Sequence, residues 1–416
     1  MIRIHPSKNR NKVIVPSSKS LLHRYLFAAA LAEGKTVIKN VSFSNDINDS
    51  IEFLKLFKKK IKVNKNTIIV YEDKNNNIKN ASLIMKDSAT TLRLAIPVLG
   101  ALSNKTIIRT SERLLERPFS VYQDIFLKQK LNFIFGKDII EFTGPLKAGL
   151  YEIPGFISSQ FISGLLFALP LLHSDSVLKV IRPIESLSYV NLTLSVLKKA
   201  QIKVEKKQNL YLINGNQKYQ SFNINCEGDY SQAAFFIGLG LINSKVIIGN
   251  FNKNSIQGDK QMIDIVKKLN GNIMEKGNKI IVKPSVLRGG IIDLKDCPDL
   301  GPILMVIAAT VNDKFEFINA SRLRIKESDR VASMEVELKK IGVDIYSTFD
   351  SVIINGGINV NQEINFSSHN DHRIFMALAV LATILPFGAT ITNEECIKKS
   401  YPKFIYDLKR MNVLIE

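Results

Sequence analysis

The sequence lacks several features that would mark a class of protein at once. Tryptophan is absent, and the three cysteines, Cys226, Cys297 and Cys396, lie far apart and form no CxxC pair. Neither a disulfide framework nor a zinc knuckle is therefore supported. No apolar run approaches the roughly 18–20 uncharged residues that span a bilayer, and residues 1–6 hold no apolar block of the kind found in a signal peptide. We expect a cytoplasmic protein that does not associate with a membrane.

The common motifs of metal-dependent, triad and nucleotide-binding enzymes are missing as well. The sequence contains no HExxH, no spaced cluster of histidine and cysteine, no GxSxG and no GxxxxGKS/T. Zinc hydrolysis, serine-triad hydrolysis and a P-loop nucleotide site each use one of these patterns. These three kinds of chemistry are therefore disfavoured.

The length and composition are those of a globular protein with more than one domain. The chain has 416 residues, more than one hydrophobic core normally supports, so two domains are expected. Hydrophobic residues make up 45% and charged residues 23%, which excludes a disordered chain.

Positive charge exceeds negative charge, but most of the excess is lysine. Lys and Arg number 57 against 38 Asp and Glu, a net charge of +19. Only 14 are arginine, so 57 − 14 leaves 43 lysines, many in exposed-looking runs such as 58–60 and 74–77. Such an excess suggests nucleic-acid binding, yet a coding bias toward Lys, Asn and Ile explains it without any partner. The basic runs also lack interleaved stacking aromatics, so we expect no nucleic-acid partner.

Six segments repeat one pattern, a short polar cap followed by a long apolar helix rich in Ala, Leu, Ile and Phe. The caps lie near residues 18, 88, 158, 229, 299 and 370, which are 70, 70, 71, 70 and 71 residues apart. Short β-type runs and one polar helix, such as 48–57, lie between successive caps. The fixed period predicts six α/β units, three to each domain.

The six helix starts predict a site for anions. Each cap supplies Ser, Thr, Asp or Asn to the first helical N–H groups, and the apolar helices are expected to be buried. A helix start carries partial positive charge and N–H groups that bind anions. Capping alone explains the polar residues, but it does not explain the basic residues beside them, such as Lys19, Arg93 and Arg373.

The scarce arginines gather in the same segments. Arg24, Arg93 and Arg373 lie in first turns, Arg117 lies in a Glu-Arg-Pro segment, and three more lie within 322–330. The planar guanidinium group fits carboxylates and phosphates. We therefore infer a site for small polyanions.

Three carboxylates lie among these cations, Asp299, Glu327 and Asp371. Nearby positive charge lowers the pKa of a carboxyl group and keeps it ionised, so that it can accept a proton from a substrate hydroxyl. A structural ion pair is the alternative role, and Asp371 fits a helix cap equally well.

Seven short motifs resemble the signature segments of the EPSP synthase (3-phosphoshikimate 1-carboxyvinyltransferase) family. They follow the family's order: PSSKSLLHR (16–24), ERP (116–118), SSQF (158–161), EGD (227–229), QGD (257–259), KESDR (326–330) and NDHR (370–373). The resemblance implies an α/β (α+β) fold with two domains of three βαβαββ units each and a cleft between them. It places one domain at 19–228 and the other at 1–18 plus 229–416.

The resemblance also implies the reaction. The enolpyruvyl group of phosphoenolpyruvate passes to the 5-hydroxyl of shikimate 3-phosphate, and phosphate is released by addition and elimination without a metal ion or cofactor. The family serves the shikimate pathway toward chorismate and aromatic amino acids, and we expect a cytoplasmic monomer. Both substrates are anions, which agrees with the placement of the arginines.

The site residues follow by position from the same resemblance. Those implied to hold shikimate 3-phosphate are Lys19, Ser20, Arg24, Ser158, Ser159, Ser186, Tyr189, Asp299, Lys326 and Arg322, the last standing where the family often has asparagine. Those implied to hold phosphoenolpyruvate are Lys19, Ala89, Thr90, Arg93, Arg117, Gln160, Arg330, Arg373 and Lys399. Asp299, Glu327 and Lys19 are implied to share the proton transfers, with His372 beside them. The domain at 19–228 is implied to hold mainly shikimate 3-phosphate, and the other to complete the phosphoenolpyruvate site.

Two positions depart from the family pattern. Ala89 stands where the commonest form has glycine, and Leu94 stands where proline is usual. A methyl group at residue 89 takes up space in which the backbone could approach a bound phosphate, and alanine there resembles the subgroup that tolerates glyphosate. We expect weaker inhibition by glyphosate than in glycine-bearing relatives, with phosphoenolpyruvate use retained.

Two further alternatives share the fold. The sister enzyme that transfers enolpyruvate to UDP-N-acetylglucosamine places a reactive cysteine before its Arg-Pro segment, but residues 110–117 contain none. The Ser-Ser-Gln at 158–160 also favours the shikimate substrate. A binding protein without catalysis is the second alternative, and the intact set of acid, base and arginine residues argues against it.

Overall fold

The computed structural model describes residues 1–8, 12–71 and 78–416, and these divide into two compact units. The continuous unit is Ser18–Cys226, and the discontinuous unit combines Met1–Ser17 with Glu227–Glu416. Each unit has its own hydrophobic core. The substrate assignments that the family resemblance gave to its two domains stay predictions.

The continuous unit contains three four-stranded sheets over its described residues. Its strands are β3 (Thr36–Lys39), β4 (Ile61–Asn64), β5 (Thr67–Val70), β6 (Asn80–Ile84), β7 (Lys105–Arg109), β8 (Phe133–Phe135), β9 (Ile139–Thr143), β10 (Leu150–Pro154), β11 (Ser176–Ile181), β12 (Glu205–Lys207), β13 (Leu210–Ile213) and β14 (Asn223–Asn225). The strand orders are β14-β3-β5-β4, β6-β7-β9-β8 and β10-β11-β13-β12. In each order the first pair is parallel and the next two pairs are antiparallel.

Three apolar helices form the centre of the continuous unit, and the amphipathic helices pack around them. The helices are α1 (Lys19–Leu31), α2 (Asn45–Lys55), α3 (Ala89–Leu102), α4 (Glu112–Leu115), α5 (Ser120–Lys128), α6 (Ser159–Ala168), η1 (Leu169–Leu171) and α7 (Leu187–Lys199). Almost every residue of α1, α3 and α6 after the first turn is buried, as their composition predicted. A Cβ atom at Gly164 of α6 would lie 2.5 Å from the Arg93 carbonyl oxygen, so α3 and α6 pack closely because this residue is glycine.

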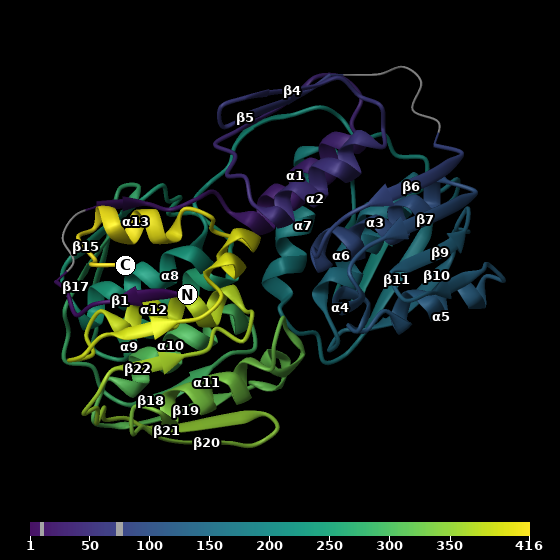
Figure 1. Cartoon of the computed structure of the whole chain (residues 1–416). Helices are drawn as coiled ribbons and strands as arrows, with labels where there is room; N and C mark the ends of the chain where they lie inside the picture. Colours follow the sequence, from purple (N-terminus) through teal and green to yellow (C-terminus); the bar gives the residue numbers. More distant parts are fainter. Residues whose placement is uncertain (9–11, 72–77) are drawn as a thin grey trace. The chain divides into compact units, whose positions relative to one another are not determined.

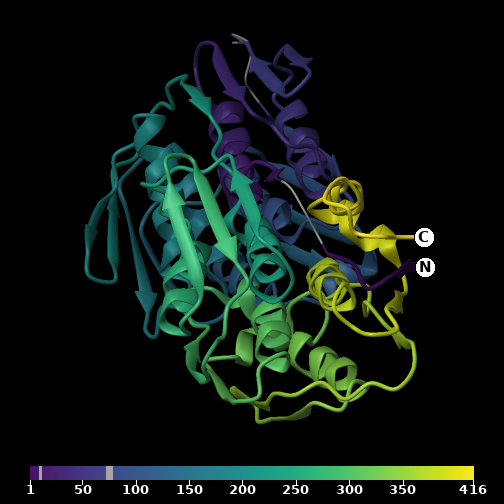
Figure 2. The ribbon, with the colours of Figure 1, turned by 90° about the vertical axis from the view of Figure 1, so that its left-hand side faces the viewer.

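Over its described residues, the discontinuous unit repeats this four-stranded pattern in two sheets and has three strands in its third sheet. Its strands are β1 (Ile2–Ile4), β2 (Lys12–Ile14), β15 (Val246–Gly249), β16 (Asn272–Lys276), β17 (Lys279–Lys283), β18 (Gly290–Asp293), β19 (Lys314–Ile318), β20 (Asp344–Ser347), β21 (Ser351–Asn355), β22 (Ile364–Phe366) and β23 (Ala389–Ile391). The orders are β2-β15-β17-β16, β18-β19-β21-β20 and β22-β23-β1. Strands from the beginning of the chain thus complete sheets of the second half, and both views show the purple N-terminal segment beside yellow C-terminal elements (Figures 1 and 2).

Three apolar helices form the core of this unit too. Its helices are α8 (Tyr230–Ile242), η2 (Gly258–Lys260), α9 (Gln261–Lys268), η3 (Pro298–Leu300), α10 (Gly301–Ala309), η4 (Ser321–Ile325), α11 (Arg330–Lys339), α12 (His372–Ala382), η5 (Glu394–Lys399) and α13 (Phe404–Arg410). All residues of α10 and α12, and nearly all of α8, are buried. None of the helices within the described ranges is long and apolar enough to cross a membrane.

The six apolar helices begin at residues 19, 89, 159, 230, 301 and 372, close to the predicted caps. Five of them have the expected side-chain cap, from Ser18, Ser88, Ser158, Asp229 and Asp371. The prediction that Asp299 caps α10 is wrong, because that helix begins after Leu300 without a side-chain cap. Pro302 in its first turn has no N–H group to satisfy, and the Asp299 carboxylate contacts cations instead.

The lysine runs are less uniform than the sequence suggested. Lys58 and Lys60 are exposed, but Lys59 is buried, with its Nζ 3.3 Å from the Ala29 carbonyl oxygen and also bonded to that of Ala32. The ammonium group therefore satisfies carbonyl groups at the end of α1. The run at 74–77 lies outside the described residues.

Candidate functional site

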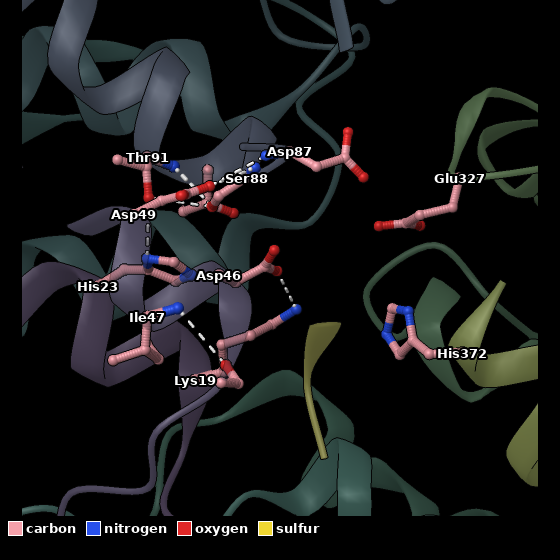
Figure 3. Close-up of polar contacts among 12 residues, drawn as sticks. Lys19, His23, Asp46, Ile47, Asp49, Asp87, Ser88, Thr91, Glu327 and His372 are labelled. Carbon is pink, nitrogen blue, oxygen red and sulfur yellow. Dashed lines mark hydrogen bonds and ion pairs between the residues drawn. The ribbon is translucent and has the colours of Figure 1, made fainter. Parts of the chain in front are cut away.

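The start of α1 presents a cap and a lysine. The Ser18 hydroxyl accepts the Leu21 N–H at 3.4 Å. Lys19 follows as the first helical residue, and its Nζ lies 2.7 Å from an Asp46 carboxylate oxygen on α2. Ser20, the next residue, is half-buried. The ion pair fixes where the Lys19 ammonium group lies (Figure 3).

Arg24 lies one turn further along α1 and is only 1% exposed. Its guanidinium group donates to neutral oxygens, the carbonyls of Ser20 (2.7 Å) and Tyr189 (3.1 Å) and the hydroxyls of Thr193 (2.8 Å) and Ser163 (3.4 Å). Burial lowers the pKa of Arg24 to about 10. Within the described residues no carboxylate contacts this buried cation, and an uncompensated buried charge is costly. The arrangement therefore favours an anionic ligand beside Arg24.

The start of α3 holds Arg93 in a chain of contacts with α6. Arg93 donates to the Gln160 side-chain oxygen at 2.8 Å, and the Gln160 amide nitrogen donates to Thr90 Oγ1 at 2.7 Å. The guanidinium carbon also lies 5.3 Å and 5.0 Å from the ring centroids of Phe119 and Phe161. These contacts fix the guanidinium group beside the first turns of both helices.

Serines line the starts of α6 and α7. The Ser158 hydroxyl accepts the Gln160 N–H at 3.3 Å, and Ser159 is buried at the first helical position. Ser186 precedes α7 with a left-handed backbone, φ 50° and ψ 46°, which is uncommon for a residue other than glycine. Such strained conformations concentrate at ligand sites. The half-buried Tyr189 lies in the first turn of α7.

The buried face of α2 bonds to both helix starts (Figure 3). Asp49 accepts hydrogen bonds from three consecutive backbone N–H groups, those of residues 86–88, at 2.9, 3.1 and 3.0 Å. The Ser50 hydroxyl lies 2.6 Å from His23 Nδ1 on α1 and 2.7 Å from Thr91 Oγ1 on α3. Helix α2 therefore ties the segment before α3 to α1.

Arg330 is the centre of a charged cluster in the discontinuous unit and is 1% exposed. Its Nη1 lies 2.9 Å from Asp299, its Nη2 lies 2.7 Å from Glu327, and its Nε lies 2.8 Å from Asp371. The three carboxylates hold the pKa of Arg330 above its usual range against the opposite effect of burial. The arginine is therefore permanently charged and rigidly placed.

Asp299 joins Arg330 to two further cations. Arg373 Nη2 lies 2.8 Å from one carboxylate oxygen, and Lys326 Nζ lies 3.4 Å from the other. Burial would raise the pKa of Asp299, but the charges of Arg373, Lys326 and Arg330 outweigh burial and hold the pKa well below its usual range. Burial also lowers the pKa of Lys326 to about 8.

Asp371 combines both roles that the sequence left open. It caps α12 by accepting the Arg373 N–H at 2.8 Å, and it is an ion-pair partner of Arg330. Burial would raise the pKa of Asp371, but Arg330 lowers it below the usual range. The prediction of depressed pKa values is thus confirmed for Asp299 and Asp371. His372 is buried at the first position of α12 (Figure 3).

Three groups of predicted residues are brought together, each within one unit. Arg24 joins Ser20 and Tyr189 in the first. Thr90, Arg93 and Gln160 form the second, a chain of contacts, and Asp299 with its partners forms the third. The structure places the remaining predicted residues in half-buried positions, Arg117 after α4, Arg322 in η4 and Lys399 at the end of η5.

The supporting carboxylates on α2 and in η2 were not predicted from the sequence. Asp46 and Asp49 lie three residues apart, so they share one face of a helix, and this spacing was the available signal. Asp259 lay inside a recognised motif but received no role. Its carboxylate accepts the Ser231 hydroxyl, and burial followed by the charge of Asp299 raises its pKa to about 7.

In the part of the chain that the structure describes, no three His, Cys, Asp or Glu side chains lie together so that they could hold a metal ion.

Comparison with known proteins places this geometry in one family. The model of EPSP synthase (3-phosphoshikimate 1-carboxyvinyltransferase) matches residues 5–408. The 3-phosphoshikimate 1-carboxyvinyltransferase of Clostridium kluyveri is 39% identical over 413 residues, covering 99% of this chain and 97% of the relative. The enzyme of the same name from Clostridium acetobutylicum is 37% identical, with the same coverage of both chains.

Solved structures show the same fold. An EPSP synthase from Acinetobacter baumannii aligns with a TM-score of 0.83 and 24% identity, covering 100% of this chain and 99% of that one. The enolpyruvyl transferase NikO from Streptomyces tendae aligns with a TM-score of 0.78 and 14% identity, covering 100% and 98%. The α/β fold expected from the sequence is thus that of the enolpyruvyl transferases.

Proposed function

The chain belongs to the EPSP synthase family, and from this premise we propose which of its residues bind and convert the substrates. It transfers a carboxyvinyl group to 3-phosphoshikimate in the shikimate pathway. The residue assignment is supported above all by the surroundings of Asp299. Its carboxylate contacts three cations, those of Lys326, Arg330 and Arg373. Such a site suits a hydroxyl substrate that is itself an anion.

We assign the substrates to the two sets of polar residues that the family resemblance implied. Shikimate 3-phosphate is held by Lys19, Ser20, Arg24, Ser158, Ser159, Ser186, Tyr189, Asp299, Lys326 and Arg322. Phosphoenolpyruvate is held by Lys19, Ala89, Thr90, Arg93, Arg117, Gln160, Arg330, Arg373 and Lys399. Two observations support these assignments: the buried Arg24 contacts no carboxylate among the described residues, and the guanidinium group of Arg93 is held in place by Gln160.

The proton transfers are assigned to Asp299, Glu327 and Lys19. Asp299 accepts the proton of the 5-hydroxyl as that oxygen attacks the enolpyruvyl carbon. In the free protein its low pKa makes it a weak base. Anionic substrates bound to Lys326, Arg330 and Arg373 would offset the positive charge, raise the pKa of Asp299 and so strengthen the base. Glu327 and Lys19, with His372 as a further member, are assigned the proton that is added to the methylene carbon in the addition step. The same groups take a proton from the resulting methyl group in the elimination step, in which the carbon–oxygen bond to phosphate breaks and the double bond forms again.

The alternatives from the sequence are not favoured. The two Clostridium relatives, each of which this chain covers to 97% of its length, are named for 3-phosphoshikimate and not for UDP-N-acetylglucosamine. The enolpyruvyl transferase NikO shares 14% identity, which indicates fold alone. Binding to nucleic acid has no support from the family, and action as a cytoplasmic monomer remains the expectation from sequence.

Release of phosphate from phosphoenolpyruvate tests the proposal. We expect release only when shikimate 3-phosphate is added, and Asp299→Ala should lower kcat about 10²- to 10⁴-fold because the general base is lost. Asp264→Ala removes an exposed carboxylate of α9 and is the matched control, expected to keep wild-type kcat. Release driven instead by UDP-N-acetylglucosamine would contradict the proposed substrate, and full activity of Asp299→Ala would contradict the proposed base.

A further inference from the structure

The segment that leads into α3 gives three consecutive N–H groups to one side chain. Asp49 Oδ1 accepts the Lys86 N–H at 2.9 Å, and Asp49 Oδ2 accepts those of Asp87 and Ser88 at 3.1 and 3.0 Å. Hydrogen bonds from N–H groups to a carboxylate are among the strong ones in proteins. The path of the backbone from 86 to 88 is therefore set by the position of Asp49 on α2 (Figure 3).

The next four backbone N–H groups, those of residues 89–92, differ in whether they have an acceptor. Ser88 accepts the Thr91 N–H on its hydroxyl at 3.3 Å and the Leu92 N–H on its carbonyl oxygen at 3.0 Å. The N–H groups of Ala89 and Thr90 lie between these bonds and have no acceptor among the described residues. They are the donors that the first turn of a helix leaves over, in the segment that carries two of the residues assigned to phosphoenolpyruvate.

We propose that Asp49 is a positioning residue for phosphoenolpyruvate, because it holds residues 86–88 so that the N–H groups of Ala89 and Thr90 face an anionic group of that substrate. The proposal rests on the proposed function, in which Ala89 and Thr90 contact phosphoenolpyruvate. Asp49 itself does not touch the substrate in this arrangement.

A carboxylate at this position is difficult to explain by packing alone. Asp49 is 3% exposed, and no cation among the described residues contacts it. Burial raises the pKa of Asp49, and the three backbone N–H groups lower it in part. A buried carboxylate costs free energy that hydrogen bonds only partly recover. Asparagine would offer one acceptor oxygen and turn its amide N–H groups toward the backbone donors.

The neighbouring residue strengthens the link between α2 and α3. Ser50 bonds through its hydroxyl to Thr91 Oγ1 at 2.7 Å and to His23 Nδ1 at 2.6 Å. Both Asp49 and Ser50 are buried, so this end of α2 presents a polar face to the starts of two helices. Glu52 and Lys55 of the same helix lie outside this face and are exposed.

Asp49→Asn in the full chain tests the proposal with two measurements. Hydrogen exchange of the backbone at 86–88 should become faster in the variant, because the amide offers fewer acceptors. The KM for phosphoenolpyruvate should rise at least ~10-fold, as expected when bonds to a charged group are lost. The KM for shikimate 3-phosphate should stay within about twofold of the wild-type value, since the loss is local.

Two further variants control the experiment. Glu52→Gln removes a carboxylate from the same helix whose partner is the exposed Lys55, and it should leave both KM values unchanged. Asp49→Glu keeps the charge, so its KM for phosphoenolpyruvate should lie between those of the wild type and Asp49→Asn. This variant decides the question if Asp49→Asn does not fold.

Two results would overturn the proposal. Unchanged exchange at 86–88 in Asp49→Asn would show that the carboxylate does not hold the segment. Faster exchange with both KM values altered in parallel, or with neither altered, would show a structural role only. Failure of the proposed function is a different result, since wild-type protein would then release no phosphate from phosphoenolpyruvate with shikimate 3-phosphate.

Discussion

The charged residues around Arg330 balance one another before any substrate binds. Three cations and three carboxylates form this cluster, Lys326, Arg330 and Arg373 with Asp299, Glu327 and Asp371. Each carboxylate contacts a guanidinium group that is nearly inaccessible to water, so these ion pairs are screened little by salt. An arriving anion must therefore compete with carboxylates for the same donors, which makes its binding sensitive to the charge of each cation.

Lys326 is the cation in this cluster whose charge changes in an accessible pH range. Burial lowers its pKa to about 8, so the free protein loses this charge as the pH rises through 8. If the neutral amine does not bind shikimate 3-phosphate, KM should rise up to ~10-fold for each pH unit above 8. Lys326→Arg stays charged, and its KM should be flat between pH 7 and 9.5. Initial rates across this pH range measure both profiles.

Lys339→Arg is the matched control, because this lysine lies on the exposed side of α11 and pairs with Glu335. It should show the wild-type slope. A flat profile in the wild type, or an equal slope in Lys326→Arg, would remove Lys326 from the proposed set.

Asp259 makes the folded protein less stable as the pH rises. A carboxylate in an ion pair has the opposite effect, because its pKa is lowered in the fold. Its folded-state pKa is about 7, well above the usual value of 3.8, because it is buried and lies in the field of Asp299. The unfolded chain ionises near pH 4 while the fold keeps the proton, so stability falls as the pH rises from about 4 to 7 and is then level. Asp259→Asn should remove this loss and raise stability by about 1–4 kcal/mol above pH 7.

Thermal unfolding of the wild type and Asp259→Asn at pH 5 and pH 8 measures this effect. The stability gain should be larger at pH 8 than at pH 5. A gain that is equal at both values, or a loss at pH 8, would show that Asp259 is ionised in the fold.

At the scale of elements, Ala89 is the first residue of α3, where we propose that phosphoenolpyruvate contacts the helix. It is 8% exposed, and its N–H group is one of the two left without an acceptor among the described residues. The methyl group lies next to that N–H and limits how closely a bound molecule approaches. Ala89→Gly should therefore lower the inhibition constant of glyphosate by roughly 10-fold, the effect of about one methyl group on a tight contact.

The assay is inhibition of phosphate release by glyphosate at fixed phosphoenolpyruvate. Ala101→Gly makes the same change at the far end of α3 and should leave inhibition unaltered. An inhibition constant close to those of sensitive relatives that does not change in Ala89→Gly would contradict the role given to this methyl group.

Much of the element pattern could be predicted, because it depends on local signals. Polar caps followed by apolar runs located the starts of α1, α3, α6, α8 and α12 within about one or two residues. The start of α10 was misread, since Asp299 forms ion pairs with residues far along the chain that no local pattern shows. The hydrogen-bond partners of Asp49 could not be predicted for the same reason, because they lie 37–39 residues away.

Which individual charged side chains are buried could not be predicted from the sequence either. Lys59 looked like its exposed neighbours but binds carbonyl groups at the end of α1. The polar helix expected at 48–57 begins at Asn45 because Ser44 caps it, and this earlier start includes Asp46, which is buried in α2 together with Asp49. The family resemblance supplied residue roles, whereas contacts between distant segments came only from the structure.

At the scale of the whole molecule, the net charge was a poor guide to function, because it suggested nucleic-acid binding. The placement of the arginines was a better guide, because it indicated a site for small anions. The net charge of +19 comes mostly from lysine, while the arginines near helix starts are buried or paired, as Arg24, Arg93 and Arg330 show. Family membership agrees with the distribution, because the substrates assigned to these residues are small anions and not a polymer.

The pairing of the first strands also sets an order of events during synthesis. Residues of β1 find their partners only when β23 exists, with Ile2 opposite Ile391, and β2 waits for β15. The continuous unit has all its described strands by Asn225. A ribosome adding 5–20 residues per second therefore leaves β1 without a partner for about 20–80 s. Nascent chains that stop before β23 would expose an unpaired edge, whereas the earlier unit could already be folded.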